Sequence, residues 1–88
     1  PRLEHLSLGL TAVTDAGLGE LTGLLRLRTL NLNNTKVTDA GLKRVAGLRE
    51  LQALDLYNTR VTDAGLKGLA GLRRLEHLSV GHVGKVTD

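Results

Sequence analysis

The sequence predicts an α/β solenoid, in which copies of one short unit stack along an axis. Three observations carry this prediction. The 88-residue chain repeats itself every 24 residues, each unit opens with the alternation of a strand, and each continues with the apolar spacing of a short helix. Because so short a unit cannot bury its apolar face alone, successive units must stack and share one continuous core.

The repeat boundaries follow from aligned leucines. Leu3, Leu27, Leu51 and Leu75 open successive units at a spacing of 24 residues. The units therefore cover residues 3–26, 27–50 and 51–74, with a partial unit at 75–88. We interpret residues 1–88 as one repeat domain of about three and a half units. It is expected to be a fragment of a longer array, because neither end resembles a capping unit.

A strand is predicted near the start of each unit. In the second unit Leu30 and Leu32 alternate with Thr29, Asn31 and Asn33, which gives one aliphatic and one polar side to the strand. Each unit returns to the next strand by a crossover, so the strands must pair in parallel. The expected strands are His5–Ser7, Thr29–Asn31, Ala53–Asp55 and His77–Ser79.

A short helix is predicted on the return leg. Thr38 and Asp39 are residues that cap a helix or favour its first turn. Leu42, Val45 and Leu48 follow at three-residue spacing and form one apolar stripe. The helices are expected near residues 15–22, 39–46 and 63–70, and the leucines expected to be buried are Leu30, Leu42, Leu54 and Leu66.

Small residues at fixed places in the unit indicate packing constraints. Gly47 is expected to end the middle helix in a left-handed conformation. Gly41 lies inside that helix, and the same glycine recurs in the neighbouring units, which indicates a close approach to the sheet or to the next unit. Thr35 and Thr59 end their strands, where a hydroxyl can bond backbone groups.

Composition narrows the class of protein further. Tyr57 is the only aromatic residue, so the core must consist of stacked Leu, Val and Ala. The net charge of +3 is too small to imply nucleic-acid binding by itself, and the absence of cysteine excludes disulfides and thiolate metal sites. No apolar run approaches the roughly 20 residues that span a bilayer. The compartment stays unassigned.

The consensus L-x-x-L-x-L-x-x-T-x-V, which continues as T-D-A-G-L, resembles the leucine-rich-repeat family. It resembles most the short-helix branch found in bacteria and in F-box-associated proteins, although Thr stands where the family usually has Asn or Cys. The resemblance implies a right-handed solenoid with a parallel sheet on its concave face and short helices on its convex face. It also implies that partners bind to the concave face.

The predicted function is therefore non-enzymatic binding of a protein partner. We name the polar side of the strands the strand face, and it carries His5, Ser7, Thr29, Asn31, Ala53, Asp55, His77 and Ser79. On this face and its edges the candidate binding residues are Arg28, Asn31, Asn33, Asp55, Tyr57 and Asn58. Tyr57 is the expected anchor, with space beside it at Gly81, because Tyr offers a large, stiff contact surface with one hydroxyl.

Catalysis and metal binding are poorly supported. Asp55, His77 and Ser79 contain the residue types of a catalytic triad, but parallel register puts Asp55 beside Ser79 rather than beside the histidine. His5 and His77 lie three units apart, on the order of 14 Å, which is too far for one zinc ion. No cofactor is predicted.

Two other partner classes remain open. Nucleic acid is the less favoured one, because the basic residues are interrupted by acids and have no aromatic residues among them. These aligned basic pairs are Lys36 with Arg60, Lys43 with Lys67, and Arg49 with Arg73. End-to-end self-association is the other class, because the first and last units have apolar stripes without an outer neighbour.

Overall fold

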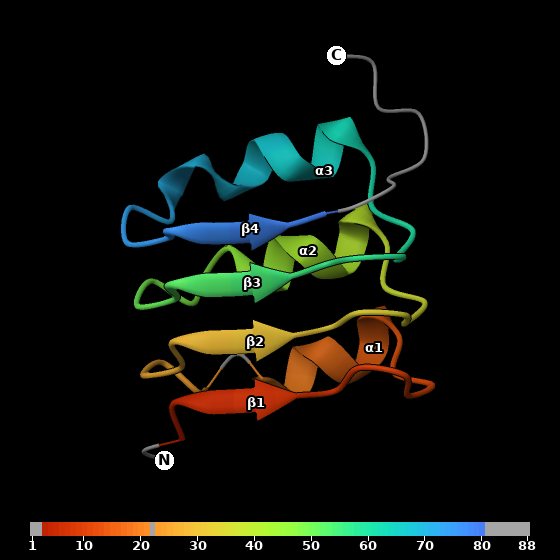
Figure 1. The fold of residues 1–88 in the computed structure, drawn as a ribbon, viewed down its shortest axis with the longest axis horizontal. Helices are drawn as coiled ribbons and strands as arrows, with labels where there is room; N and C mark the ends of the chain where they lie inside the picture. Colours follow the sequence, from red (N-terminus) through yellow and green to blue (C-terminus); the bar gives the residue numbers. More distant parts are fainter. Residues whose placement is uncertain (1–2, 22, 81–88) are drawn as a thin grey trace.

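A computed structural model describes residues 3–21 and 23–80, which form a layer of strands packed against a layer of short helices (Figure 1). The expected end of the first helix at Thr22, the space at Gly81 and the rest of the partial unit lie outside the described residues. In chain order the elements are β1 (His5–Ser7), α1 (Asp15–Leu18), the 3₁₀ helix η1 (Gly19–Leu21), β2 (Thr29–Asn31), α2 (Asp39–Val45), β3 (Ala53–Asp55), α3 (Asp63–Lys67), the 3₁₀ helix η2 (Gly68–Gly71) and β4 (His77–Ser79).

The four strands form one parallel sheet in the order β1-β2-β3-β4, as predicted. Their register follows the repeat, since Leu6, Leu30, Leu54 and Leu78 lie directly opposite one another. Hydrogen bonds between units continue beyond the three-residue strands. For example, the N–H of Leu8 donates to the carbonyl of Asn31 at 2.8 Å. Neighbouring units therefore stay in register where the chain leaves the sheet.

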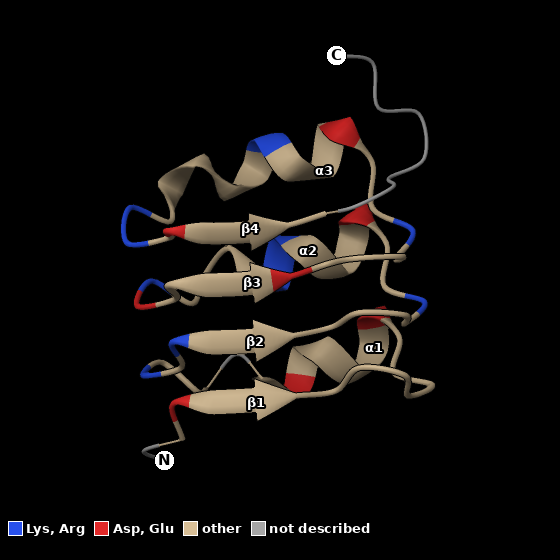
Figure 2. Cartoon of the chain, viewed as in Figure 1, with Lys and Arg blue, Asp and Glu red and all other residues tan. Residues whose placement is uncertain are grey.

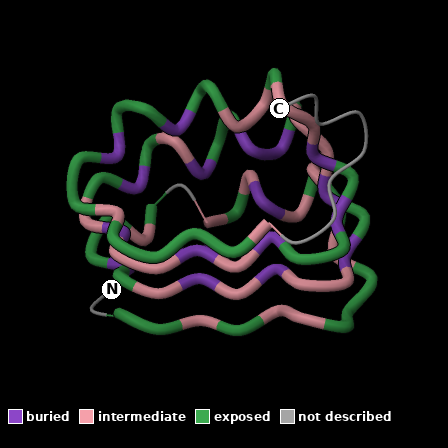
Figure 3. The backbone as a smooth tube through the Cα atoms, turned by 45° about the horizontal axis from the view of Figure 1, so that its top comes forward, coloured by how far each residue is buried: buried purple, intermediate pink, exposed green. Residues whose placement is uncertain are grey.

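The core lies between the sheet and the helices (Figure 3). Leu30 and Leu54 are 0% and 2% exposed, and Leu42 on α2 is equally buried, which confirms three of the predicted core positions. Leu66 is only half-buried, so that prediction was wrong. The reason is its place on α3, the outermost helix of the described residues, which packs against α2 on its inner side.

The predicted helices are present at the predicted places. The hydroxyl of Thr38 accepts a hydrogen bond from the N–H of Ala40, so this threonine caps α2.

The prediction that Gly47 ends this helix in a left-handed conformation was wrong. α2 ends at Val45, its C-cap Ala46 is right-handed with φ −61°, and Gly47 does not adopt a left-handed conformation. Instead the N–H of Gly47 donates to the carbonyl of Arg44, which tightens the last turn in the manner of a 3₁₀ helix.

Gly41 and Gly65 confirm the predicted close approach between units. A Cβ at Gly65 would collide with the carboxylate of Asp39, one unit earlier, and a Cβ at Gly41 would collide in the same way with that of Asp15.

The two threonines that follow the strands also behave as predicted. The hydroxyls of Thr35 and Thr59 are buried and donate to backbone carbonyls three residues earlier, each at 2.8 Å.

None of the helices in the described residues has the length and apolarity required to cross a membrane.

Candidate functional site

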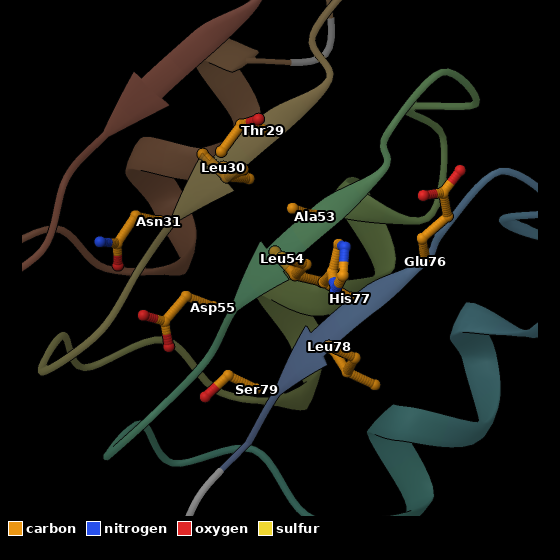
Figure 4. A pocket seen from close by; sticks show the side chains of 10 residues that line it. All are labelled: Thr29, Leu30, Asn31, Ala53, Leu54, Asp55, Glu76, His77, Leu78 and Ser79. Carbon is orange, nitrogen blue, oxygen red and sulfur yellow. The ribbon is translucent and has the colours of Figure 1, made fainter.

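The strand face is the side of the sheet that the helices leave uncovered, and its side chains stand in two columns (Figure 4). The register aligns His5, Thr29, Ala53 and His77 in one column and Ser7, Asn31, Asp55 and Ser79 in the other. Over β2, β3 and β4 the face is hollowed into an open groove. The groove is lined by Thr29, Leu30, Asn31, Ala53, Leu54, Asp55, Glu76, His77, Leu78 and Ser79.

Asn31 and Asp55 lie in this groove, and local hydrogen bonds fix their orientation. The Oδ1 of Asn31 accepts from the N–H of Asn33, and the Oδ1 of Asp55 accepts from the N–H of Tyr57, each at 2.9 Å. These are the same Asx turn in two successive units. Within the described part of the chain, Nδ2 of Asn31 and Oδ2 of Asp55 have no hydrogen-bond partner. Each residue therefore offers one oriented polar group to a ligand in the groove.

Tyr57 and Asn58 lie beyond the end of β3, at a margin of the strand face that we name the exit edge (residues 8–11, 32–36 and 56–60). Tyr57 is 50% exposed, so its ring is available to a partner. Asn58 donates from Nδ2 to the Oδ1 of Asn34 in the preceding unit. Asn33 is half-buried and its side chain lies over Gly9, where it fills the space that the glycine leaves.

Arg28 lies at the opposite margin, just before β2, in the turns that lead into the strands. We name this margin the entry edge (residues 23–28, 47–52 and 71–76). The Nε of Arg28 is 4.0 Å from a carboxylate oxygen of Glu4, and both side chains are about half exposed, so the pair contributes little to stability. The six candidate residues thus do not form one cluster: two lie in the groove, three at the exit edge and one at the entry edge.

The register of the sheet fixes which residues lie side by side, and so it tests the arrangement of residues that a catalytic triad or a metal site would need. Asp55 lies opposite Ser79, whereas His77 lies opposite Ala53, so the residues that resemble a triad are not arranged in the order that a triad needs. His5 and His77 belong to the two outer strands of the four-stranded sheet. In residues 3–21 and 23–80, no three His, Asp or Glu side chains gather closely enough to hold a metal ion.

Two features of the site were not predicted from the sequence. The first is the left-handed backbone at Asn34 and Asn58, with φ 55° and 56°. The sequence feature that could have predicted this backbone conformation is the Asn that precedes Thr35 and Thr59, because Asn tolerates a left-handed conformation better than most residues. The second is the groove itself, because eight of its ten lining residues lie outside the six candidates. These are the strand-face residues Thr29, Ala53, His77 and Ser79, the leucines Leu30, Leu54 and Leu78, and Glu76 at the entry edge. The repeat pattern predicts a polar strand face but does not specify where on that face a groove forms.

Comparisons with known proteins agree with this architecture. The sequence model described as "Leucine Rich repeat" matches residues 27–46 and 48–70, which are most of the second and third units. Among solved structures, an internalin (inlF) from Listeria monocytogenes is similar, with a TM-score of 0.62 and 21% sequence identity. The match covers 99% of this chain and 31% of the internalin chain, so the chain spans about a third of that protein's length. Comparison with curated proteins found no significant match.

Fold and strand face together define the class: a solenoid with a parallel sheet on one side and short helices on the other. The family match identifies the second and third units as leucine-rich repeats. The structural likeness shows the same fold over nearly the whole chain.

Proposed function

We propose that this chain is a non-enzymatic interaction module that binds a protein partner on the strand face. The observation that carries the proposal is the open groove over β2, β3 and β4, whose lining combines six polar side chains with Ala53 and three leucines. Such a surface suits an extended or loop-shaped protein segment, because the polar groups can pair with its backbone and side chains. Leucine-rich repeats commonly use this face for protein partners.

Tyr57 is the proposed anchor of this interface. It is the only aromatic residue of the sequence, it is half exposed, and the Asx turn with Asp55 fixes its backbone. An aromatic side chain held on a rigid strand end loses little conformational entropy when a partner covers it. Asn31 and Asp55 supply hydrogen bonds in the groove beside it, and Asn33 and Asn58 extend the polar rim along the exit edge.

The test begins with a partner isolated by affinity capture and then purified, so that a dissociation constant can be measured. Tyr57→Ala is expected to weaken binding by about 2 kcal/mol, or roughly 30-fold in Kd, as hot-spot truncations do. Lys43→Ala on the exposed surface of α2 is the matched control and should leave Kd unchanged. Equal binding by wild type and Tyr57→Ala would exclude Tyr57 as the anchor.

A second variant tests the groove separately from the anchor. Asp55→Asn keeps an oxygen that can accept from the N–H of Tyr57 but removes the charge. If a partner contacts the groove, this variant should change Kd while the circular dichroism spectrum and melting temperature stay close to wild type. If Asp55→Asn and Tyr57→Ala both bind as wild type does, the strand face is not the binding surface.

A further inference from the structure

A second pocket lies at the entry edge, away from the groove, and arginines dominate its lining. It is lined by Ala46, Arg49, Gly71, Arg73 and Arg74. Gly71 is the last residue of η2, and the other residues come from two neighbouring turns, the one between α2 and β3 and the one between η2 and β4. Figure 2 shows basic residues gathered at the turns that lead into the strands.

The two turns present their arginines in the same way. The N–H of Arg49 donates to the carbonyl of Gly47, and the N–H of Arg73 donates to that of Gly71, each at 3.0 Å. Because the backbone geometry is the same, the two side chains leave their turns in equivalent directions, one unit apart. Arg74 adds a third guanidinium in the outer turn, where the inner turn has Glu50.

The positive charge of this pocket is not balanced within the described residues. Arg49, Arg73 and Arg74 are exposed, and none of them forms an ion pair or hydrogen bond through its side chain in the part of the chain that the structure describes. Glu50 lies in the same turn as Arg49 but does not line the pocket. Three guanidinium groups that share one pocket repel one another, and an anion between them relieves the repulsion.

The helix dipole explains only part of this arrangement. α2 ends at Val45 and η2 ends at Gly71, and a basic side chain is favourable after such a terminus. This accounts for one arginine in each turn, at Arg49 and Arg73. It does not account for Arg74, which adds a second positive charge to the same short turn.

We propose that the arginine pocket formed by Arg49, Arg73 and Arg74 is a binding site for a phosphate monoester. A phosphate monoester carries about −1.5 to −2 charges at pH 7, and its three oxygens accept the paired N–H groups of guanidinium. The exposed Gly71, where a side chain would meet open space, leaves room for the ligand to approach. The site is independent of the strand face and of the function proposed for it.

A phosphodiester backbone fits this pocket less well. Lys36 and Arg60, an aligned basic pair, lie on the exit edge, at the other end of the strands from this pocket. At the entry edge, Arg28 lies within 4.0 Å of Glu4, so its charge is partly balanced. The acidic Asp15, Asp39 and Asp63 lie on the same side as Lys36 and Arg60, at the helix starts. The pocket therefore favours one compact, doubly charged group over an extended polyanion.

The test is a titration of the ¹⁵N-labelled protein with inorganic phosphate and with a short Gly-Ser peptide that carries one phosphoserine, followed by NMR. Shifts are expected in the amides of residues 47–50 and 71–74. Arg73→Gln and Arg74→Gln should each weaken binding by about five-fold or more. Glu50→Gln should strengthen binding. Lowering the pH from 7.5 to 5.5 should weaken it, because the phosphate then loses its second charge.

Arg26→Gln is the matched control, since Arg26 stands in the first unit at the position of Arg74 but does not line the pocket. It should bind phosphate as wild type does. If the phosphopeptide binds more tightly than inorganic phosphate, the source is a phosphorylated protein side chain, and equal binding assigns a small phosphorylated molecule. Absence of shifts, equal loss in Arg26→Gln, or tighter binding of a DNA duplex through Lys36 and Arg60 would each overturn the proposal.

Discussion

Asn34 and Asn58 adopt a left-handed backbone at the exit edge, and Leu10 does the same one unit earlier with φ 60°. The three residues occupy the same place in the repeat. The N–H of Leu10 donates to the carbonyl of Asn33, just as the N–H of Asn34 donates to that of Tyr57. Asn tolerates this conformation, whereas an aliphatic side chain is strained there. Leu10 is also 80% exposed, so burial does not offset the strain.

Leu10→Asn is therefore expected to raise the free energy of unfolding by about 1 kcal/mol. The new side chain relieves the strain, and its amide oxygen can accept from Nδ2 of Asn34, as Asn34 accepts from Asn58. Chemical denaturation measures the change. Leu10→Ala is the control, because it removes the same exposed apolar surface without the preference of Asn for this conformation. An equal gain in both variants would contradict the strain argument.

At the residue scale, the alternation of the repeat was enough to predict interior strand positions, whereas the binding role of the six candidate residues stays a prediction. Leu30 and Leu54 could be assigned to the core because periodicity alone places them on the inner side of a strand. The separation of Arg28 from Tyr57 could not be predicted in the same way. Each residue lies close to a strand of its own unit, but the strands are only three residues long. Arg28 comes just before β2 and Tyr57 just after β3, so the two residues lie at opposite edges of the sheet.

Adjacent helices are joined by a repeated contact between aspartate, threonine and glycine. The carboxylate of Asp39 accepts hydrogen bonds from the N–H of Thr62, at 2.7 Å, and from its hydroxyl. Asp15 makes the same two contacts with Thr38. The Asp of one unit thus stabilises the start of the next helix, and the glycine in that helix leaves room for the carboxylate. The V-T-D-A-G-L motif is therefore a device for stacking units.

Gly65→Ala tests this contact, because its added methyl group would collide with Asp39. Overpacking of this kind should lower the free energy of unfolding by about 1–3 kcal/mol. Gly68→Ala is the matched control, since a Cβ there meets no other atom and its φ of −70° suits alanine. That variant should be neutral or more stable by about 0.5 kcal/mol. Thermal and urea unfolding measure both.

A double mutant separates this contact from a general cost of alanine in α3. The atoms nearest to a Cβ at Gly65 all belong to the side chain of Asp39. In the Asp39→Ala background the cost of Gly65→Ala should therefore fall clearly. An undiminished cost would show that the glycine serves a different contact.

At the element scale, the sequence predicted where the helices lie, but not how neighbouring helices pair or which turn closes α2. Thr38 and Asp39 were expected to act on their own helix, and Thr38 does so. Asp39 instead bonds to the next unit, a role that a single repeat cannot reveal because it exists only when units stack. The end of the helix near Ala46 was predicted, but its geometry was not, since a 3₁₀ turn satisfies the last carbonyls without a left-handed residue.

Burial at equivalent positions shows how the whole molecule depends on stacking. Leu30 and Leu54 have a unit on each side and are buried, whereas Leu78 on β4 is 43% exposed. Leu6 on β1 is only half-buried. The repeat pattern predicts the same environment for all four leucines, so the difference arises from the number of neighbouring units. Each described outer unit therefore presents apolar surface along the direction of stacking.

The 88-residue polypeptide studied by itself is expected to associate as its concentration rises. The exposed parts of Leu3 and Leu78 are apolar surface that a second copy can cover. β1 and β4 have the same sequence, His-Leu-Ser, and each follows a glutamate, so β1 of one copy can occupy the place of a strand next to β4 of another. Contact between unlike ends is heterologous, so it would add copies without a fixed limit. Sedimentation velocity over a wide range of concentrations should show a rising average mass. Leu78→Lys should suppress that rise while circular dichroism stays close to wild type, whereas a constant monomer mass would rule out this mode of association.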